Sequence, residues 1–238
     1  MGLRDFFKSR RNREGSDTNT ASNGGAERRR ELRDAWRALE TEDFDSAINH
    51  AQEFMDAADD ALALESRKIV SLGQFRKENY STAVPLFHEI AKTTNDVGDW
   101  FNVITSATMA GDIELGEHAF DQALRLQKAA DYSEQPSVPF MRQYFACALR
   151  DRGEYEKALG QIEELRSIYE QLKITDDTFV YIRGVPFLSH TMDVAVDVFR
   201  GLGNTFDSIG WIDSFATKLD DEGREYLQTV KERIAMGN

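Results

Sequence analysis

Four segments of this chain repeat one pattern of residue types, and a pattern that recurs every few dozen residues is typical of folds built from stacked units. In each segment an acid or asparagine precedes an aromatic residue or isoleucine, a small residue follows three positions later, and apolar residues return four and seven positions beyond it. The small residues are separated by 36, 33 and 42 positions. The segments are 42–54, 78–90, 111–123 and 153–165, and their small residues are Ala47, Ala83, Gly116 and Ala158.

The fourth segment indicates what each unit is. A helical pattern ends at Gly153, which can adopt a left-handed or tightly turned conformation at little steric cost. Glu154 then favours the positive N-terminal end of a second helix, and Ala158 lets the two helices approach closely. Apolar residues recur at three- and four-residue spacing through almost all of residues 28–238, without a convincing alternating strand. The sequence therefore predicts an all-α fold of antiparallel helix hairpins.

The turn pattern of residues 153–158, together with Trp100 and Val103 in the preceding repeat, resembles the tetratricopeptide repeat family. The resemblance covers about residues 28–170 and implies a right-handed superhelical solenoid. The sequence departs from the family pattern in two ways. The closing proline of the family is absent, and Glu42 stands at the first turn in place of glycine. The 42-residue interval predicts longer helices or a loop between the third and fourth repeats.

The C-terminal part, residues 175–238, follows the repeat pattern poorly. Residues 176–203 predict a long helix kinked near Gly184 and Pro186. Residues 204–219 predict a further helix with Asn204 as its N-cap. The last segment has a charged face and few apolar residues, which is typical of the helix that caps a solenoid.

Residues 1–26 form a separate region, a predicted disordered basic arm and linker, before the solenoid of residues 27–238. Five basic residues and two phenylalanines lie within residues 1–13, and a stretch rich in Gly, Ser, Thr and Asn follows. Aromatic and basic side chains together suit a weak contact with an anionic membrane or with a second partner. The candidate arm residues are Phe6, Phe7, Lys8, Arg10 and Arg11. The alternatives are a merely disordered tail, or a tail that folds back on the acidic body and inhibits it.

The charge distribution bears on partners. The formal net charge is −13, with a net +4 in residues 1–30 and −17 in the remainder. An acidic body repels phosphates, which disfavours nucleic acid as a partner. The single cysteine, Cys147, excludes a disulfide framework, and the sequence contains neither an apolar run long enough to span a membrane nor a signal-peptide block. We expect a cytoplasmic protein, with a location at the inner face of the membrane as the alternative.

The family resemblance implies that the first helix of each hairpin lines a concave groove that holds a protein or peptide partner. Lys68 is followed by Leu72 where the family's carboxylate clamp has asparagine, which favours a mixed basic and apolar groove for an amphipathic or acidic peptide. The alternative is that several of these side chains pack between repeats. The candidate groove residues are Lys68, Leu72, Phe75, Arg76, Phe101, Thr105, Met109, Gln143 and Arg150.

Catalytic and metal-binding motifs are absent from the sequence: it contains no glycine-rich nucleotide loop, no HExxH and no CxxC. Ser189, His190 and Asp193 match a triad only in composition. We therefore expect a non-enzymatic scaffold or adaptor that needs no cofactor or metal. A peptide-sensing regulator, a membrane-tethered assembly factor, and an enzyme with an unrecognised site are the alternatives.

Overall fold

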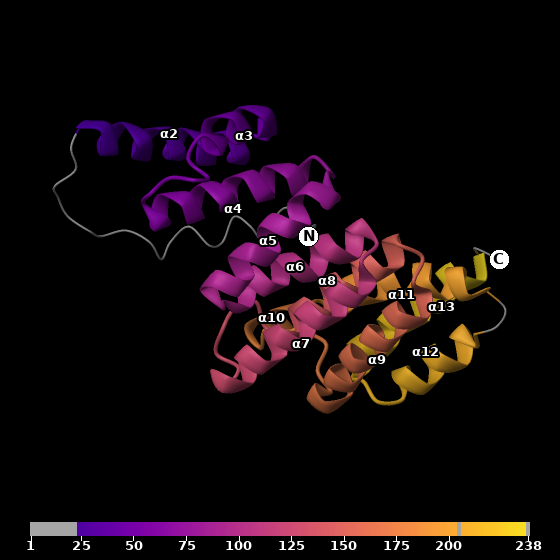
Figure 1. The fold of residues 1–238 in the computed structure, drawn as a ribbon. Helices are drawn as coiled ribbons and strands as arrows, with labels where there is room; N and C mark the ends of the chain where they lie inside the picture. Colours follow the sequence, from indigo (N-terminus) through magenta and orange to yellow (C-terminus); the bar gives the residue numbers. More distant parts are fainter. Residues whose placement is uncertain (1–22, 204–205, 237–238) are drawn as a thin grey trace.

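A computed structural model describes residues 23–203 and 206–236, which form twelve α-helices and no strand (Figure 1). The helices are α2 (Asn23–Glu40), α3 (Phe44–Gln52), α4 (Asp60–Arg76), α5 (Tyr80–Thr94), α6 (Val97–Ala110), α7 (Ile113–Ala129), α8 (Val138–Asp151), α9 (Tyr155–Leu172), α10 (Asp177–Ile182), α11 (Leu188–Leu202), α12 (Ser208–Ala216) and α13 (Asp221–Met236). The predicted all-α class is confirmed.

The first eight of these helices form four hairpins that follow one another along the molecule (Figure 1). The two helices of each hairpin pack together: α2 with α3, α4 with α5, α6 with α7, and α8 with α9. The second helix of a hairpin also contacts the first helix of the next, and α2 contacts α4, α6 contacts α8, and α8 contacts α11. Each helix is therefore buried mainly by its neighbours in the chain.

The turns inside the hairpins have the left-handed backbone that the repeat pattern predicts. Gly111 and Gly153 hold φ values of 90° and 76°. The first two hairpins use the same conformation without glycine, since Glu42 and Glu78 have φ values of 63° and 62°. Side-chain capping follows at two of the four turns: Asp43 accepts a hydrogen bond from the Ser46 amide, and an equivalent aspartate caps α7.

The small residue of each repeat lies where the two helices of its hairpin cross. Ala47, Ala83 and Ala158 have no exposed surface, and Gly116 is buried. Gly116 is the tightest case, because a Cβ atom there would lie 2.4 Å from the hydroxyl oxygen of Thr108 in α6. The close approach predicted from the sequence is therefore present in the structure.

Two hydrophobic cores lie along the chain of helices. A smaller core joins α2, α3 and the first part of α4, with Leu32, Ile48 and Ile69 among its buried residues. A larger core begins at Phe75 near the end of α4 and continues to Ile234 in α13. The helix α4 therefore contributes to both cores and connects them.

Several boundaries differ from the sequence predictions. The helix α2 begins at Asn23 and includes residues 23–26, which the pattern places in the linker. The expected long kinked helix is wrong: α10 and α11 are separate, because Gly184 takes a φ of 68° and Pro186 lacks an amide donor. The predicted cap Asn204 lies outside the described residues, and α12 is capped by Asp207, which accepts a hydrogen bond from the Gly210 amide.

Pro85 is the sixth residue of α5 and so lies beyond the first turn of that helix. The long third interval is explained by α7, which has 17 residues, and by the loop of residues 130–137. The C-terminal helix α13 packs against α11 and α12 and ends the described fold.

Candidate functional site

The helix α6 lies in the middle of the fold, and one of its sides faces the second helices of the hairpins. The Trp100 ring meets His88 of α5 with 5.8 Å between ring centroids, and meets His118 of α7 at 6.2 Å. Trp100 is 5% exposed. This side of α6 is therefore part of the hydrophobic core.

The opposite side of α6 faces the first helices of the neighbouring hairpins. The Asp99 carboxylate lies 3.3 Å from the Lys68 ammonium of α4, and the Phe101 ring packs edge-on against Tyr144 of α8 at 5.4 Å. Because each helical residue turns by about 100°, Asn102 points between these two directions. It therefore faces the region between α4 and α8.

Asn102, Thr105 and Met109 form one strip on this side of α6, which we call the α6 strip. Asn102 is only 6% exposed, and no described residue donates a hydrogen bond to its Oδ1 atom. Thr105 is satisfied locally, since its hydroxyl lies 3.3 Å from the Phe101 carbonyl. Met109 is half-buried. The strip thus combines an unpaired buried acceptor with an adaptable apolar side chain.

A row of aromatic rings extends from the start of α8 to the start of α11. Phe140 contacts Tyr181 of α10 at 6.5 Å, and Tyr181 contacts Phe187 at 6.0 Å. We call Phe140, Tyr144, Tyr181 and Phe187 the aromatic row, in which Tyr144 lies one turn beyond Phe140 on α8. Tyr181 is 55% exposed and its neighbour Ile182 is 75% exposed. Large exposed apolar side chains that gather in one place are typical of interaction surfaces.

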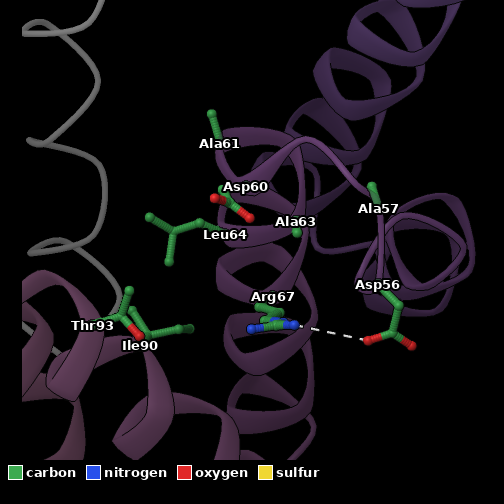
Figure 2. A pocket seen from close by; sticks show the side chains of 9 residues that line it. All are labelled: Asp56, Ala57, Asp60, Ala61, Ala63, Leu64, Arg67, Ile90 and Thr93. Atoms are coloured by element: carbon green, nitrogen blue, oxygen red, sulfur yellow. Dashed lines mark ion pairs between the residues drawn. The ribbon is translucent and has the colours of Figure 1, made fainter.

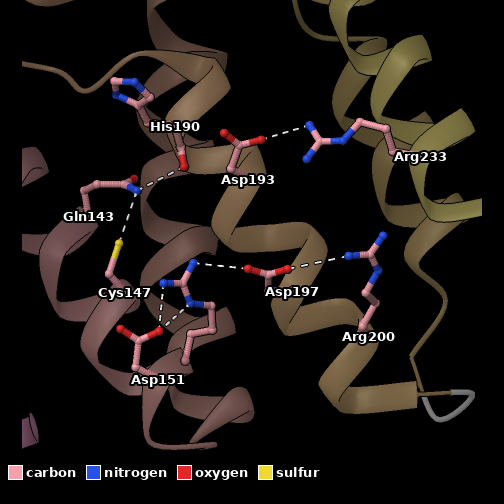
Figure 3. A network of polar contacts seen from close by, with 9 residues as sticks. Gln143, Cys147, Asp151, His190, Asp193, Asp197, Arg200 and Arg233 are labelled. Atoms are coloured by element: carbon pink, nitrogen blue, oxygen red, sulfur yellow. Dashed lines mark hydrogen bonds and ion pairs between the residues drawn. The ribbon is translucent and has the colours of Figure 1, made fainter. Parts of the chain in front are cut away.

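Next to the row, a buried polar network ties α8, α9 and α11 together. The Gln143 amide nitrogen donates to the His190 carbonyl at 3.2 Å (Figure 3). The Gln143 amide oxygen accepts from the Thr191 hydroxyl at 2.8 Å. The Tyr169 hydroxyl donates to the Pro186 carbonyl at 2.6 Å. Burial raises the pKa of Tyr169 well above its usual value. These groups stabilise the fold and leave Gln143 without its predicted freedom to bind a partner.

The C-terminal end of this face carries charged pairs, which Figure 3 shows between α8, α11 and α13. The Arg150 guanidinium lies 3.2 Å from Asp197 and 2.7 Å from Asp151. Burial lowers the pKa of Arg150, but the hydrogen bond and charge of Asp151, with the charge of Asp197, outweigh it and raise the pKa. Arg233 of α13 pairs with Asp193 at 2.9 Å. The side chains are partly exposed, so each pair contributes little stability.

The predicted groove residues fall into two groups. Four are buried and five are half-buried, and Lys68 and Arg150 already have acidic partners, Asp99 and Asp197. An acidic peptide therefore meets less free positive charge here than the sequence indicates. The buried residues are Phe75, Phe101, Thr105 and Gln143, and the half-buried ones are Lys68, Leu72, Arg76, Met109 and Arg150.

Asn102 and most of the aromatic row are not among the residues predicted from the sequence. Asn102 precedes Met109 by seven residues, or two helical turns, so helical spacing alone places it on the face predicted for Met109. Tyr181 and Phe187 had no such signal, because they lie in and after the short helix α10, outside the repeat pattern. Their proximity to Phe140 depends on how the fifth pair of helices packs.

A separate open cleft of about 600 Å³ lies between the start of α4 and the end of α5 (Figure 2). Its lining includes Asp56, Asp60 and Arg67. Arg67 pairs with Glu89 at 2.6 Å and with Asp56 at 3.8 Å, and it donates to the Met55 carbonyl at 3.0 Å. Because its one cation already has these partners, the cleft lacks a ready site for an anion.

Cys147 lies on α8 one turn beyond Gln143, which donates weakly to its sulfur at 3.8 Å. Although the residue is partly exposed, burial raises the pKa of its thiol to about 11. A thiol with that pKa stays protonated near neutral pH and is a poor nucleophile.

Within residues 23–203 and 206–236, no group of His, Cys, Asp and Glu side chains is arranged to hold a metal ion, and no helix is long and apolar enough to cross a membrane. The predicted arm residues Phe6, Phe7, Lys8, Arg10 and Arg11 lie outside the described part of the chain. No family model, curated protein or solved structure matches this sequence. The chain is accordingly defined by its fold, as an all-α protein of consecutively packed helix hairpins.

Proposed function

We propose that this protein is a non-enzymatic scaffold of the tetratricopeptide repeat type, a right-handed solenoid that binds a peptide segment of a partner along the inner face of α4, α6 and α8. The supporting features are the hairpin turns with left-handed residues, the small residues at the helix crossings, and the contacts between first helices of successive hairpins. Stacks of such hairpins present one side of their first helices as an extended binding surface.

The observation that carries the proposal is the unpaired Oδ1 atom of Asn102. A buried acceptor without a donor costs roughly 1–3 kcal/mol, so native proteins retain one chiefly where a ligand or water completes it. A backbone N–H of an extended peptide is a suitable donor, because it is present at every residue whatever the peptide sequence. Met109 would then contact an apolar side chain of the same peptide, two helical turns away.

The aromatic row supplies the second part of the surface. Tyr181 and Phe187 together with Phe140 offer ring faces and edges to apolar side chains of the partner. Because Lys68 and Arg150 are already paired, we expect the partner to be recognised mainly by its apolar residues and its backbone. This expectation differs from the acidic peptide that the sequence alone favours.

Selection from a random-peptide display library tests the proposal. The bait is the full chain, compared with Met109→Lys on the α6 strip and with a matched control, Ala129→Lys, at an exposed position of α7. We expect peptides rich in aromatic and aliphatic residues, and an affinity loss of about tenfold or more for Met109→Lys. Peptides that bind both variants equally well would place the binding surface elsewhere and refute the role of the inner face.

A further inference from the structure

The unpaired Asn102 and the aromatic row lie on a protein whose own first residues have matching chemistry. Residues 1–13 carry five of the 29 Lys and Arg residues and one of the 42 Asp and Glu residues, so 24 basic and 41 acidic residues remain in 14–238. The same short segment contains Leu3, Phe6 and Phe7. It therefore combines positive charge with large apolar side chains.

We propose that residues 1–13 of the same chain bind the α6 strip and the aromatic row, and so compete with the partner peptide. This inference rests on the proposed function, because it makes the basic arm an internal competitor for the same surface. The occupant is the protein's own arm, in the same molecule.

Charge complementarity is the first reason. The body carries an excess of 17 acidic over basic residues, which attracts a segment that itself has an excess of four basic residues. On the inner face itself the carboxylates are already paired, Asp99 with Lys68 and Asp151 with Arg150. Charge therefore favours the arm through the net charge of the acidic body, not through a free carboxylate beside the strip.

Shape and polarity give the second reason. In the aromatic row Tyr181 is exposed and the other three rings are half-buried, and phenylalanine is a good partner for tyrosine and phenylalanine edges. When Phe6 or Phe7 inserts into the aromatic row, another part of the arm lies along α6. A backbone N–H of that part can then donate to the Oδ1 atom of Asn102. Both unexplained features of the inner face then have one occupant.

The tether gives the third reason. Nine residues, 14–22, separate the segment from the start of α2, and they are rich in Gly, Ser, Thr and Asn. Such a linker has a typical end-to-end distance of about 15–18 Å and a fully extended length of about 30 Å. At about 8–10 Å per packed helix, the linker must span at least about 16–20 Å from α2 to α6 and at least about 24–30 Å to α8. Its effective concentration is about 1 mM. An arm with a dissociation constant of about 100 µM in solution would therefore occupy its site about nine-tenths of the time.

The test uses a fluorescent synthetic peptide of residues 1–13 and full-length protein, with binding read by fluorescence anisotropy. In the wild-type chain the tethered arm competes with the added peptide. In the arm variant, a full-length chain that carries Phe6→Ser and Phe7→Ser, the tethered arm no longer competes with the added peptide. We expect the peptide to bind this arm variant about tenfold more tightly than it binds the wild type. A peptide with both phenylalanines replaced by serine serves as the control and should not bind.

The site is tested by adding Met109→Lys to the arm variant, with Ala129→Lys as the matched control. We expect the first substitution to weaken peptide binding at least about tenfold and the control to leave it unchanged. If Met109→Lys does not fold by circular dichroism, Asn102→Leu takes its place, since it removes the unpaired acceptor and keeps the volume.

Several results would overturn the inference. Equal peptide affinity for the wild type and the arm variant excludes docking within the molecule, and binding that ignores both inner-face substitutions excludes this site. A dimer that disappears in the arm variant would make a second copy the occupant. No peptide binding, combined with arm-dependent sedimentation on vesicles of phosphatidylserine and phosphatidylcholine, would make the arm a membrane contact. None of these results depends on the display selection, so the two proposals can fail separately.

Discussion

The contact between Gly116 and Thr108 gives the sharpest test of the hairpin geometry. A methyl group on Gly116 would lie 2.4 Å from the Thr108 hydroxyl oxygen, while its next neighbours, the Ile104 carbonyl and the Phe145 ring, lie at ordinary distances of 3.5 and 3.6 Å. The hydroxyl itself donates to the Ile104 carbonyl at 2.7 Å, so it cannot rotate away without losing that bond. The clash therefore involves essentially one atom.

We expect Gly116→Ala to lower the free energy of unfolding by about 1–2 kcal/mol. The overpacking costs about 1–3 kcal/mol, and the better helix propensity of alanine recovers up to about 1 kcal/mol. Gly160→Ala is the matched control, because Gly160 lies within α9 and a methyl group there meets nothing within 4 Å. In this control the free energy of unfolding should rise by about 0.5–1 kcal/mol.

Urea denaturation of the full chain, followed by far-ultraviolet circular dichroism, measures both effects at once. Thr108→Ala completes a double-mutant cycle: once the hydroxyl is gone, Gly116→Ala should change from destabilising to neutral or stabilising, with a coupling energy of about 2 kcal/mol. If Gly116→Ala stabilises the wild-type background as much as Gly160→Ala does, α6 and α7 are not in close contact at this position, and the account of the small residues is wrong.

Three other substitutions test single features. Glu78→Gly should stabilise the fold by about 0.5–1 kcal/mol in urea denaturation, because Glu78 holds a left-handed φ of 62°; a loss would indicate that the side chain stabilises the turn. Tyr169→Phe should lower the free energy of unfolding by about 1–3 kcal/mol, because the substitution leaves no cavity but removes the hydroxyl that donates to the Pro186 carbonyl. A loss below about 0.5 kcal/mol would exclude a stabilising role for this hydrogen bond. Because the folded pKa of Cys147 is raised from 9.0 to about 11, stability should fall as the pH rises from about 9 to 11, and Cys147→Ala should flatten that fall. The same shift should make the native thiol react with a disulfide reagent near neutral pH about tenfold more slowly than the unfolded chain, because about 100-fold less thiolate is partly offset by its greater nucleophilicity; equal rates would refute it.

The hairpins were predictable because their determinants are local. A turn glycine such as Gly153, an acid after it and a small residue such as Ala158 all lie within six positions, so no knowledge of distant contacts is needed. The C-terminal part was less predictable for the same reason. The break between α10 and α11 depends on Gly184, whose backbone carbonyl accepts a short hydrogen bond from Ser137 at the start of α8. That contact spans 47 positions and leaves no local trace in the sequence.

Residues that are available for binding are harder to predict than hairpins, because the exposure of a side chain depends on residues of the neighbouring repeat. Lys68 lies at a position that the family resemblance assigns to ligand contact, yet its ammonium group faces Asp99, 31 residues later. Whether the two meet depends on the 33-residue interval between the second and third small residues, which sets how α6 aligns with α4. Asn102 is the opposite case: the same alignment leaves its carbonyl oxygen buried and unpaired. The charged positions that attract attention in the sequence are thus partly neutralised within the fold, and between them an uncharged amide has a buried oxygen with no donor among the described residues. If a peptide binds along α4, α6 and α8 as proposed, we expect its backbone and apolar residues to be recognised more than its charge.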